Sequence, residues 1–236
     1  MTAQTEPANS EKTESPGVPV WDVGVRLFHW LFVAAVTFSI ATGLTGGLWQ
    51  MDWHMRSGYL IVGLIIFRLI WGVAGGRHAR FVNFLKGPVT VIRYAVDFIR
   101  RCDAHTTGHN PLGGWSVVLI LLAVGAQAGT GLFANDDIFI KGPLADLVGK
   151  DMSDVLTAWH LSLKYLVWGL IALHLSAIAA HWLRGENLVP PMLHGRKTGI
   201  DPATADGGPR WISLALAAIV AAALVYWILS LGVVAE

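Results

Sequence analysis

The apolar run at residues 158–184 constrains this chain more than any other stretch. It contains no proline and is long enough to cross a bilayer as one helix. His160, His174 and His181 lie in it at steps of 14 and 7 residues, which at about 100° per residue place all three on nearly one face. His160 and His174 are then roughly 21 Å apart along the helix axis. The run therefore predicts two separate ligand positions, one near each side of the membrane.

The composition also indicates a membrane protein. Only 14% of the 236 residues are charged and the mean hydropathy is +0.53, which is too apolar for an ordinary soluble domain. Five apolar runs are long enough to span a bilayer, near 27–48, 57–74, 113–133, 158–183 and 211–231. We therefore expect an all-α, polytopic membrane helix bundle of four ligand-holding helices plus a fifth, C-terminal transmembrane helix.

The chain divides into three expected parts. Residues 1–17 are polar, rich in Glu, Ser, Thr and Pro, and unlike a signal peptide, which predicts a disordered cytoplasmic tail. Residues 18–198 would form the membrane domain, and residues 199–236 a linker and the additional helix. Cys102 is the only cysteine, which excludes cysteine-ligated iron–sulfur clusters and covalently attached haem.

Charged residues predict the orientation of the helices. The link 75–112 contains six basic residues and the link after the fourth run contains four, whereas the loop 134–157 has five aspartates against two lysines. The positive-inside rule then places the N-terminus and both basic links in the cytoplasm, and the acidic loop and the C-terminus in the periplasm. Residues 88–102 alternate apolar residues and arginines at helical spacing, which is typical of an interfacial amphipathic helix or of a basic linker.

Histidines on three of the runs match in depth. His29 lies near the cytoplasmic end of the first run and can meet His174, while His54 lies near the periplasmic end of the second and can meet His160. A histidine within a membrane is costly and is by default a functional candidate. Two axial imidazoles leave a haem iron no open position, which favours electron transfer. The pattern predicts two non-covalent b haems, and the alternative is four ordinary histidines at helix ends.

Several neighbouring residues are candidates for contact with these haems. Gly43 follows His29 by 14 residues and therefore shares its helix face, where a glycine would let a porphyrin lie against the helix. Helix packing also favours glycine. Arg26, Arg56 and Lys164 can pair with haem propionates or extend to lipid headgroups. His181 is a candidate for a quinone site or for proton transfer, and its alternative role is that of a solvated residue at a helix end.

Four segments resemble the bacterial cytochrome b-561 family, which includes the cytochrome b subunits of nickel–iron hydrogenases, the related subunit of formate dehydrogenase and a stand-alone superoxide oxidase. The segments are RLFHW, HMRSGY, GHNPLGGWSVVLILLAVGAQAGTGLF and AWHLSLKYLVWGLIALHLSAIAAHWLRGENLVPPM. The resemblance covers about residues 20–198, and the fourth segment is its most specific part. It implies a four-helix bundle that holds two b haems and exchanges electrons with quinone.

The same resemblance assigns the haem ligands to the four histidines that pair by depth. It also implies a quinone site at the start of the third helix, here at His109 and Asn110. Two features depart from the family pattern. Stand-alone relatives tend to have four helices rather than five, and the spacing between His29 and His54 leaves only a small periplasmic loop.

Together these observations favour an electron-transfer subunit of a respiratory oxidoreductase complex in the bacterial inner membrane over an enzyme that acts alone. The expected partners are membrane lipid, quinone and a periplasmic redox protein such as a hydrogenase, a dehydrogenase or a c-type cytochrome. The alternatives are a quinone-linked superoxide oxidase and a cofactor-free membrane anchor or transporter. The net charge of +1 gives no indication of nucleic-acid binding.

Overall fold

The computed structural model describes residues 17–101, 106–208 and 210–233. Five helices within these ranges are long and apolar enough to cross a membrane. They are α1 (Val23–Thr45), α2 (Leu48–Ala74), α5 (Pro111–Gly131), α6 (Lys150–Trp182) and α8 (Trp211–Val233). The expected all-helical membrane fold is therefore confirmed. The tail expected at residues 1–17 lies, apart from Gly17, outside the described residues.

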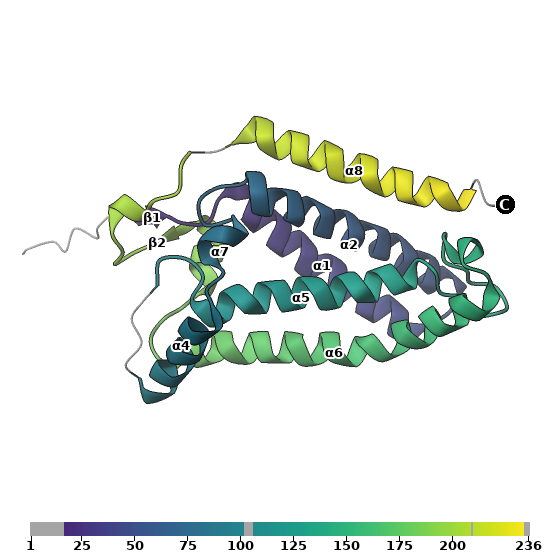
Figure 1. The fold of residues 1–236 in the computed structure, drawn as a ribbon, viewed down its shortest axis with the longest axis horizontal. Coiled ribbons are helices and arrows are strands. Elements are labelled where there is room, and N and C mark those ends of the chain that lie inside the picture. The colour runs from purple at the N-terminus through teal and green to yellow at the C-terminus, as the bar shows by residue number, and fades with distance from the viewer. Residues whose placement is uncertain (1–16, 102–105, 209, 234–236) are drawn as a thin grey trace, which may run out of the picture.

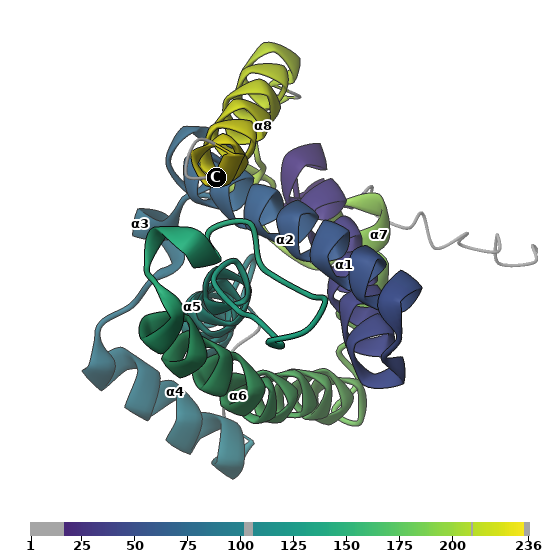
Figure 2. The ribbon, with the colours of Figure 1, turned by 90° about the vertical axis from the view of Figure 1, so that its right-hand side faces the viewer.

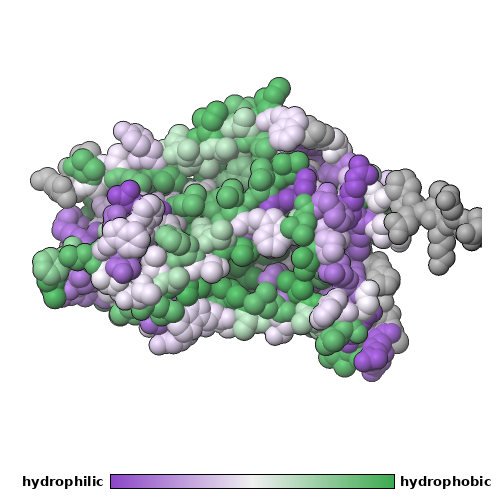
Figure 3. Space-filling model, turned by 180° about the vertical axis from the view of Figure 1, so that it is seen from behind, coloured by the Kyte–Doolittle hydropathy of each residue, from purple (hydrophilic) through white to green (hydrophobic). Residues whose placement is uncertain are grey.

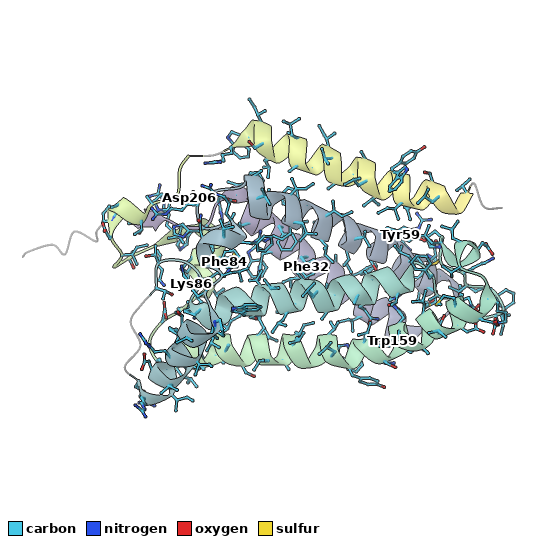
Figure 4. The ribbon with its side chains drawn as sticks, viewed as in Figure 1. Phe32, Tyr59, Phe84, Lys86, Trp159 and Asp206 are labelled. Atoms are coloured by element: carbon cyan, nitrogen blue, oxygen red, sulfur yellow. The ribbon has the colours of Figure 1, made fainter. Side chains whose placement is uncertain are left out.

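The bundle consists of α1, α2, α5 and α6 (Figure 1). α1 packs with α2, α5 packs with α6, and α2 and α5 join the two hairpins. Seen along its length, the four helices surround a common interior (Figure 2). The core is made of aliphatic and aromatic side chains such as Phe32, Leu64 and Val124, and Figure 4 shows Phe32 near the middle of the bundle.

The fifth helix, α8, lies outside the bundle against α2 (Figures 1 and 2). Ala217 and Ala221 of α8 are buried. Gly63 of α2 lets the helices approach, because a Cβ there would lie 3.3 Å from the Val225 side chain. α8 therefore flanks the bundle and leaves its interior to the other four helices.

Helix boundaries differ from those of the apolar runs. α6 begins at Lys150, because its polar first turns extend the helix beyond the part that apolar residues mark. α2 begins at Leu48, directly after Gly46 and Gly47, both of which have positive φ angles. α1 begins after Asp22, whose Oδ1 accepts a hydrogen bond from the Val25 backbone N–H at 2.8 Å. Asp22 also accepts one from Trp71 Nε1 at 2.9 Å, which ties the start of α1 to the end of α2.

Shorter elements connect the helices. The strands β1 (Val18–Pro19) and β2 (Arg196–Lys197) pair antiparallel, so the segment that contains the bundle begins and ends at one place. The others are α3 (Phe81–Phe84), α4 (Pro88–Arg100), η1 (Ala145–Leu147), α7 (Val189–His194) and η2 (Pro202–Thr204). α4 confirms that residues 88–100 are helical. On the face shown in Figure 3, apolar residues form a broad band and hydrophilic ones gather toward the two ends.

Candidate functional site

A cavity of about 430 Å³ lies inside the bundle, at the end that carries the loop between α5 and α6. α1, α2, α5 and α6 all contribute to its walls, which are mostly apolar and include Val36 and Val124. His54 of α2 and His160 of α6 line it, and their ring centroids are 5.9 Å apart. Tyr59, labelled in Figure 4, lies at this end and also lines the cavity. A cavity of this size suits a cofactor.

Both histidines that line the cavity form the same kind of hydrogen bond, from Nδ1 to a backbone carbonyl oxygen of a neighbouring helix. His54 Nδ1 lies 2.8 Å from the carbonyl oxygen of Ser39, and His160 Nδ1 lies 2.8 Å from that of Gln127. A carbonyl can only accept, so Nδ1 carries the proton and Nε2 keeps its lone pair, as in metal-bound histidines. Metal–nitrogen bonds of about 2 Å on both sides of one ion bring two rings to a centroid separation of roughly 6 Å, which agrees with the spacing of this pair.

The side-chain amide of Gln127 contacts the same ring. Its Nε2 donates to the His160 carbonyl oxygen at 2.9 Å and lies 3.3 Å from His160 Nε2. It lies equally far, 3.3 Å, from His160 Nδ1, so the amide packs against the ring and is held there by the carbonyl oxygen of the same residue.

Two glycines lie directly against the histidine rings. A Cβ on Gly43 would lie 2.9 Å from His54 Nδ1, and a Cβ on Gly131 would lie 2.8 Å from His160 Cε1. Both distances are too short for a real side chain, so these glycines make room for the imidazoles. Gly43 was expected to leave space for a porphyrin, whereas the structure places the His54 ring there. Gly131 was missed, and its only sequence signal is the small-residue stretch AGTGL that ends the third apolar run.

The second histidine pair lies at the opposite end of the bundle. His29 of α1 and His174 of α6 are both partly buried and close enough to interact electrostatically. The Nδ1 atom of His29 is buried and has no hydrogen-bond partner among the described residues. A buried nitrogen without a partner is costly, so this ring is a candidate for contact with a bound group.

The three basic candidates lie in different surroundings. Arg26 Nη1 donates to the Leu193 carbonyl oxygen of α7 at 2.7 Å. Arg56 Nε donates to Asp52 at 2.9 Å and is largely exposed. Lys164 lines the cavity. Arg26 and Arg56 are thus held by protein partners, while Lys164 is the basic candidate that reaches the cavity wall.

Asn110 and His181 come together at the end that carries His29 and His174. Asn110 Oδ1 accepts a hydrogen bond from the Gly113 backbone N–H at 2.7 Å, so its Nδ2 is the group that lies 3.3 Å from His181 Nε2. His181 Nδ1 lies 2.9 Å from Glu186 Oε2. His181 therefore carries its proton on Nδ1 and accepts at Nε2. It is only 8% exposed, so its alternative role as a solvated residue is wrong.

Glu186 links this histidine to a lysine. Lys197 Nζ lies 2.6 Å from Glu186 Oε1 and also donates to the Thr106 carbonyl oxygen at 2.7 Å. Burial raises the pKa of Glu186, but the hydrogen bond and charge of Lys197, followed by those of His181, outweigh burial and hold the pKa below its ordinary value. Glu186 is therefore an ionised carboxylate between two donors.

His109 packs between two aromatic side chains. Its ring centroid lies 4.6 Å from that of Trp21 and 4.4 Å from that of Phe84. Burial, assisted by the charges of Arg68 and His78, lowers the pKa of His109 to about 3. His109 is therefore neutral, and its buried Nδ1 has no hydrogen-bond partner among the described residues.

In the described part of the chain, no three or more His, Cys, Asp or Glu side chains gather into a group that could hold a metal ion. Each histidine pair can supply two ligands, which is the number that a porphyrin-bound iron takes from a protein in a bis-histidine site. The residues present therefore fit haem.

These features define an all-helical membrane protein with paired histidines inside a four-helix bundle. The chain belongs to the prokaryotic cytochrome b561 family, whose model matches residues 20–195. It is a prokaryotic membrane cytochrome, and the family implies haem b and electron transfer. The match includes the four bundle helices and ends before α8. The curated proteins and the solved structures gave no match.

Proposed function

We propose that this protein is a dihaem cytochrome b that transfers electrons between the membrane quinone pool and a periplasmic redox partner. His54 and His160 would hold one b haem through their imidazoles, and His29 and His174 would hold the other. Haem supplies reversible one-electron chemistry when bound. The observation that carries the proposal is the 5.9 Å separation of the His54 and His160 rings within an apolar cavity.

Contacts within the chain orient this pair of histidines. The backbone hydrogen bonds at Nδ1 fix the tautomer and hold each ring in place, and Gly43 and Gly131 allow each ring to lie against a neighbouring helix. Two histidine ligands leave no open coordination site, which suits electron transfer. The step from His160 to His174 separates the two sites by roughly 21 Å along α6.

We place the quinone site at Asn110 and His181, near the His29–His174 end, with His109 adjacent in sequence. Reduction of a quinone to its quinol consumes two electrons and two protons, so the site needs a group that exchanges protons. His181 suits this task because Nε2 is a lone-pair acceptor, and the Glu186 carboxylate on Nδ1 would stabilise the imidazolium. The reverse reaction would use the same group as a base.

The orientation and the partner follow from charge and size. The basic links would be cytoplasmic, as would the N-terminus, and the acidic loop between α5 and α6 periplasmic with the C-terminus. We assign residues 18–198 to the dihaem domain, since β1 and β2 close it at Val18 and Lys197. Its periplasmic loops are too small to hold a dehydrogenase, so a hydrogenase, a dehydrogenase or a c-type cytochrome would provide the other redox centre.

Single alanine variants of the four histidines test the ligand assignment. The purified protein should contain two low-spin b haems per chain by pyridine haemochrome assay. His54→Ala and His160→Ala should remove the same low-spin signal in electron paramagnetic resonance, and His29→Ala and His174→Ala the other. Loss of one common signal from His29→Ala and His54→Ala would overturn the pairing, and a protein without haem would overturn the function.

A further inference from the structure

Helix α4 presents an apolar stripe that faces away from the bundle. On its inner side, the Phe98 ring packs against His181 with centroids 5.0 Å apart, and Arg184 Nη1 donates to the Phe98 carbonyl oxygen at 2.6 Å. Four aliphatic side chains share the outer side, where Val89, Ile92, Val96 and Ile99 are 70, 64, 38 and 77% exposed. Their spacing of three and four residues places them on one face of the helix.

The position of α4 places this stripe where the membrane helices end. Figures 1 and 2 show α4 outside the bundle, beside the start of α5 and the end of α6. Trp115 Nε1 of α5 donates to the Lys86 carbonyl oxygen at 2.9 Å, and Arg184 directly after α6 holds Phe98. Both ends of α4 are thus attached beside the start of α5 and the end of α6, two helices that could cross a membrane.

The charges around the stripe are mainly basic. Residues 86–101 contain four basic side chains and one acidic one, Asp97, and Lys86, Arg93, Arg100 and Arg101 are all exposed. A helix that combines an exposed aliphatic stripe with basic side chains binds in the interface of membranes that contain anionic lipids. Figure 3 shows apolar and hydrophilic residues side by side at the corner of the molecule where α4 lies.

We propose that α4 lies in the membrane interface, inserts its aliphatic stripe among the acyl chains and binds anionic phospholipid headgroups through Arg93 and Arg101. Charge complementarity selects this occupant, because a second copy of the chain would bring the same basic residues together. The proposal depends on neither haem nor quinone.

Lipid quenching tests the insertion of the stripe. In the full chain with Cys102→Ser, a single cysteine is introduced by Ile99→Cys or, as the matched control on the polar flank of the same helix, by Thr90→Cys. Each variant is labelled with a bimane fluorophore and placed in nanodiscs that contain brominated phosphatidylcholine. Quenching should be at least about threefold stronger at position 99 than at position 90. Equal quenching, or protection of position 99 by a second copy or a soluble protein, would overturn the proposal.

Lipid selectivity tests the arginines. Native mass spectrometry of the full chain should show retention of phosphatidylglycerol over phosphatidylcholine, and the double variant Arg93→Gln, Arg101→Gln should lose most of that preference. Lys141→Gln is the control, since Lys141 is an exposed basic residue of the acidic loop at the other end of the bundle. A preference that survives the double variant but falls in the control would place the lipid site elsewhere and disprove the assignment to α4.

Discussion

The imidazoles of His54 and His160 lie nearly perpendicular to each other, at 80°, with centroids 5.9 Å apart, and each Nδ1 donates to a backbone carbonyl of an adjacent helix. Neither ring can turn without breaking that bond. Three features therefore determine the position of each ring: the helix that carries it, the neighbouring helix that orients it, and the cavity that it lines. This is the geometry on which the proposed haem ligation depends.

The glycine against His160 offers a direct test of this arrangement. We expect Gly131→Ala to displace the His160 ring, since its Cβ would lie 2.8 Å from that ring, and to lower the haem content from about two to about one per chain. Gly129→Ala is the control, because a Cβ there meets no atom within 4 Å. A pyridine haemochrome assay measures the haem content per chain of both variants. Full haem content in Gly131→Ala would mean that the ring is held differently.

The orientation can be tested with reporter fusions. A reporter that is active only in the periplasm should be active when fused after Asp137 and inactive when fused after Arg101, because basic residues concentrate in the second of these loops. Alkaline phosphatase activity, with a green fluorescent protein fusion as the complementary readout, measures this. The opposite pattern would reverse the sides assigned to both haem sites.

The Glu186 carboxylate should contribute to stability. Glu186→Gln leaves the partly buried Lys197 ammonium without its ion-pair partner, so we expect a loss of about 1–3 kcal/mol of unfolding free energy. Thermal denaturation in detergent measures it, and Asp146→Asn, in an exposed ion pair, should change little. Because the folded pKa of Glu186 is lowered, this contribution is present above the unfolded value of about 4.3 and is lost as pH falls through the folded pKa.

His181 should affect quinone chemistry without affecting haem binding. We expect His181→Leu to slow quinol-driven haem reduction by roughly 10²-fold or more while both haem signals persist, because His181 is a candidate proton-exchanging group and not an axial ligand. His194→Leu, which changes an exposed histidine of α7, should leave the rate unchanged. Stopped-flow absorbance follows the reaction. An unchanged rate in His181→Leu would remove this residue from the quinone site.

Much of the molecule could be predicted from the sequence alone. Length and hydropathy determine the five membrane helices, because a segment that crosses a bilayer must satisfy its own backbone hydrogen bonds and carry few charges. The fourteen-residue step from His160 to His174 determines that both lie on one face of one helix. Both constraints, the apolar length of a span and the helical spacing of two histidines, involve residues close together in the sequence, so they can be recognised without the tertiary structure.

The tertiary structure decided what depends on contacts between helices. The roles of Gly43 and Gly131 appear only when α1 meets α2 and α5 meets α6, since each glycine is defined by a ring from another helix. The same holds for the series of contacts from Asn110 through His181 to Glu186. Sequence spacing gives the direction of a side chain along its own helix, but the distance to a neighbour depends on packing between segments that are far apart in the chain.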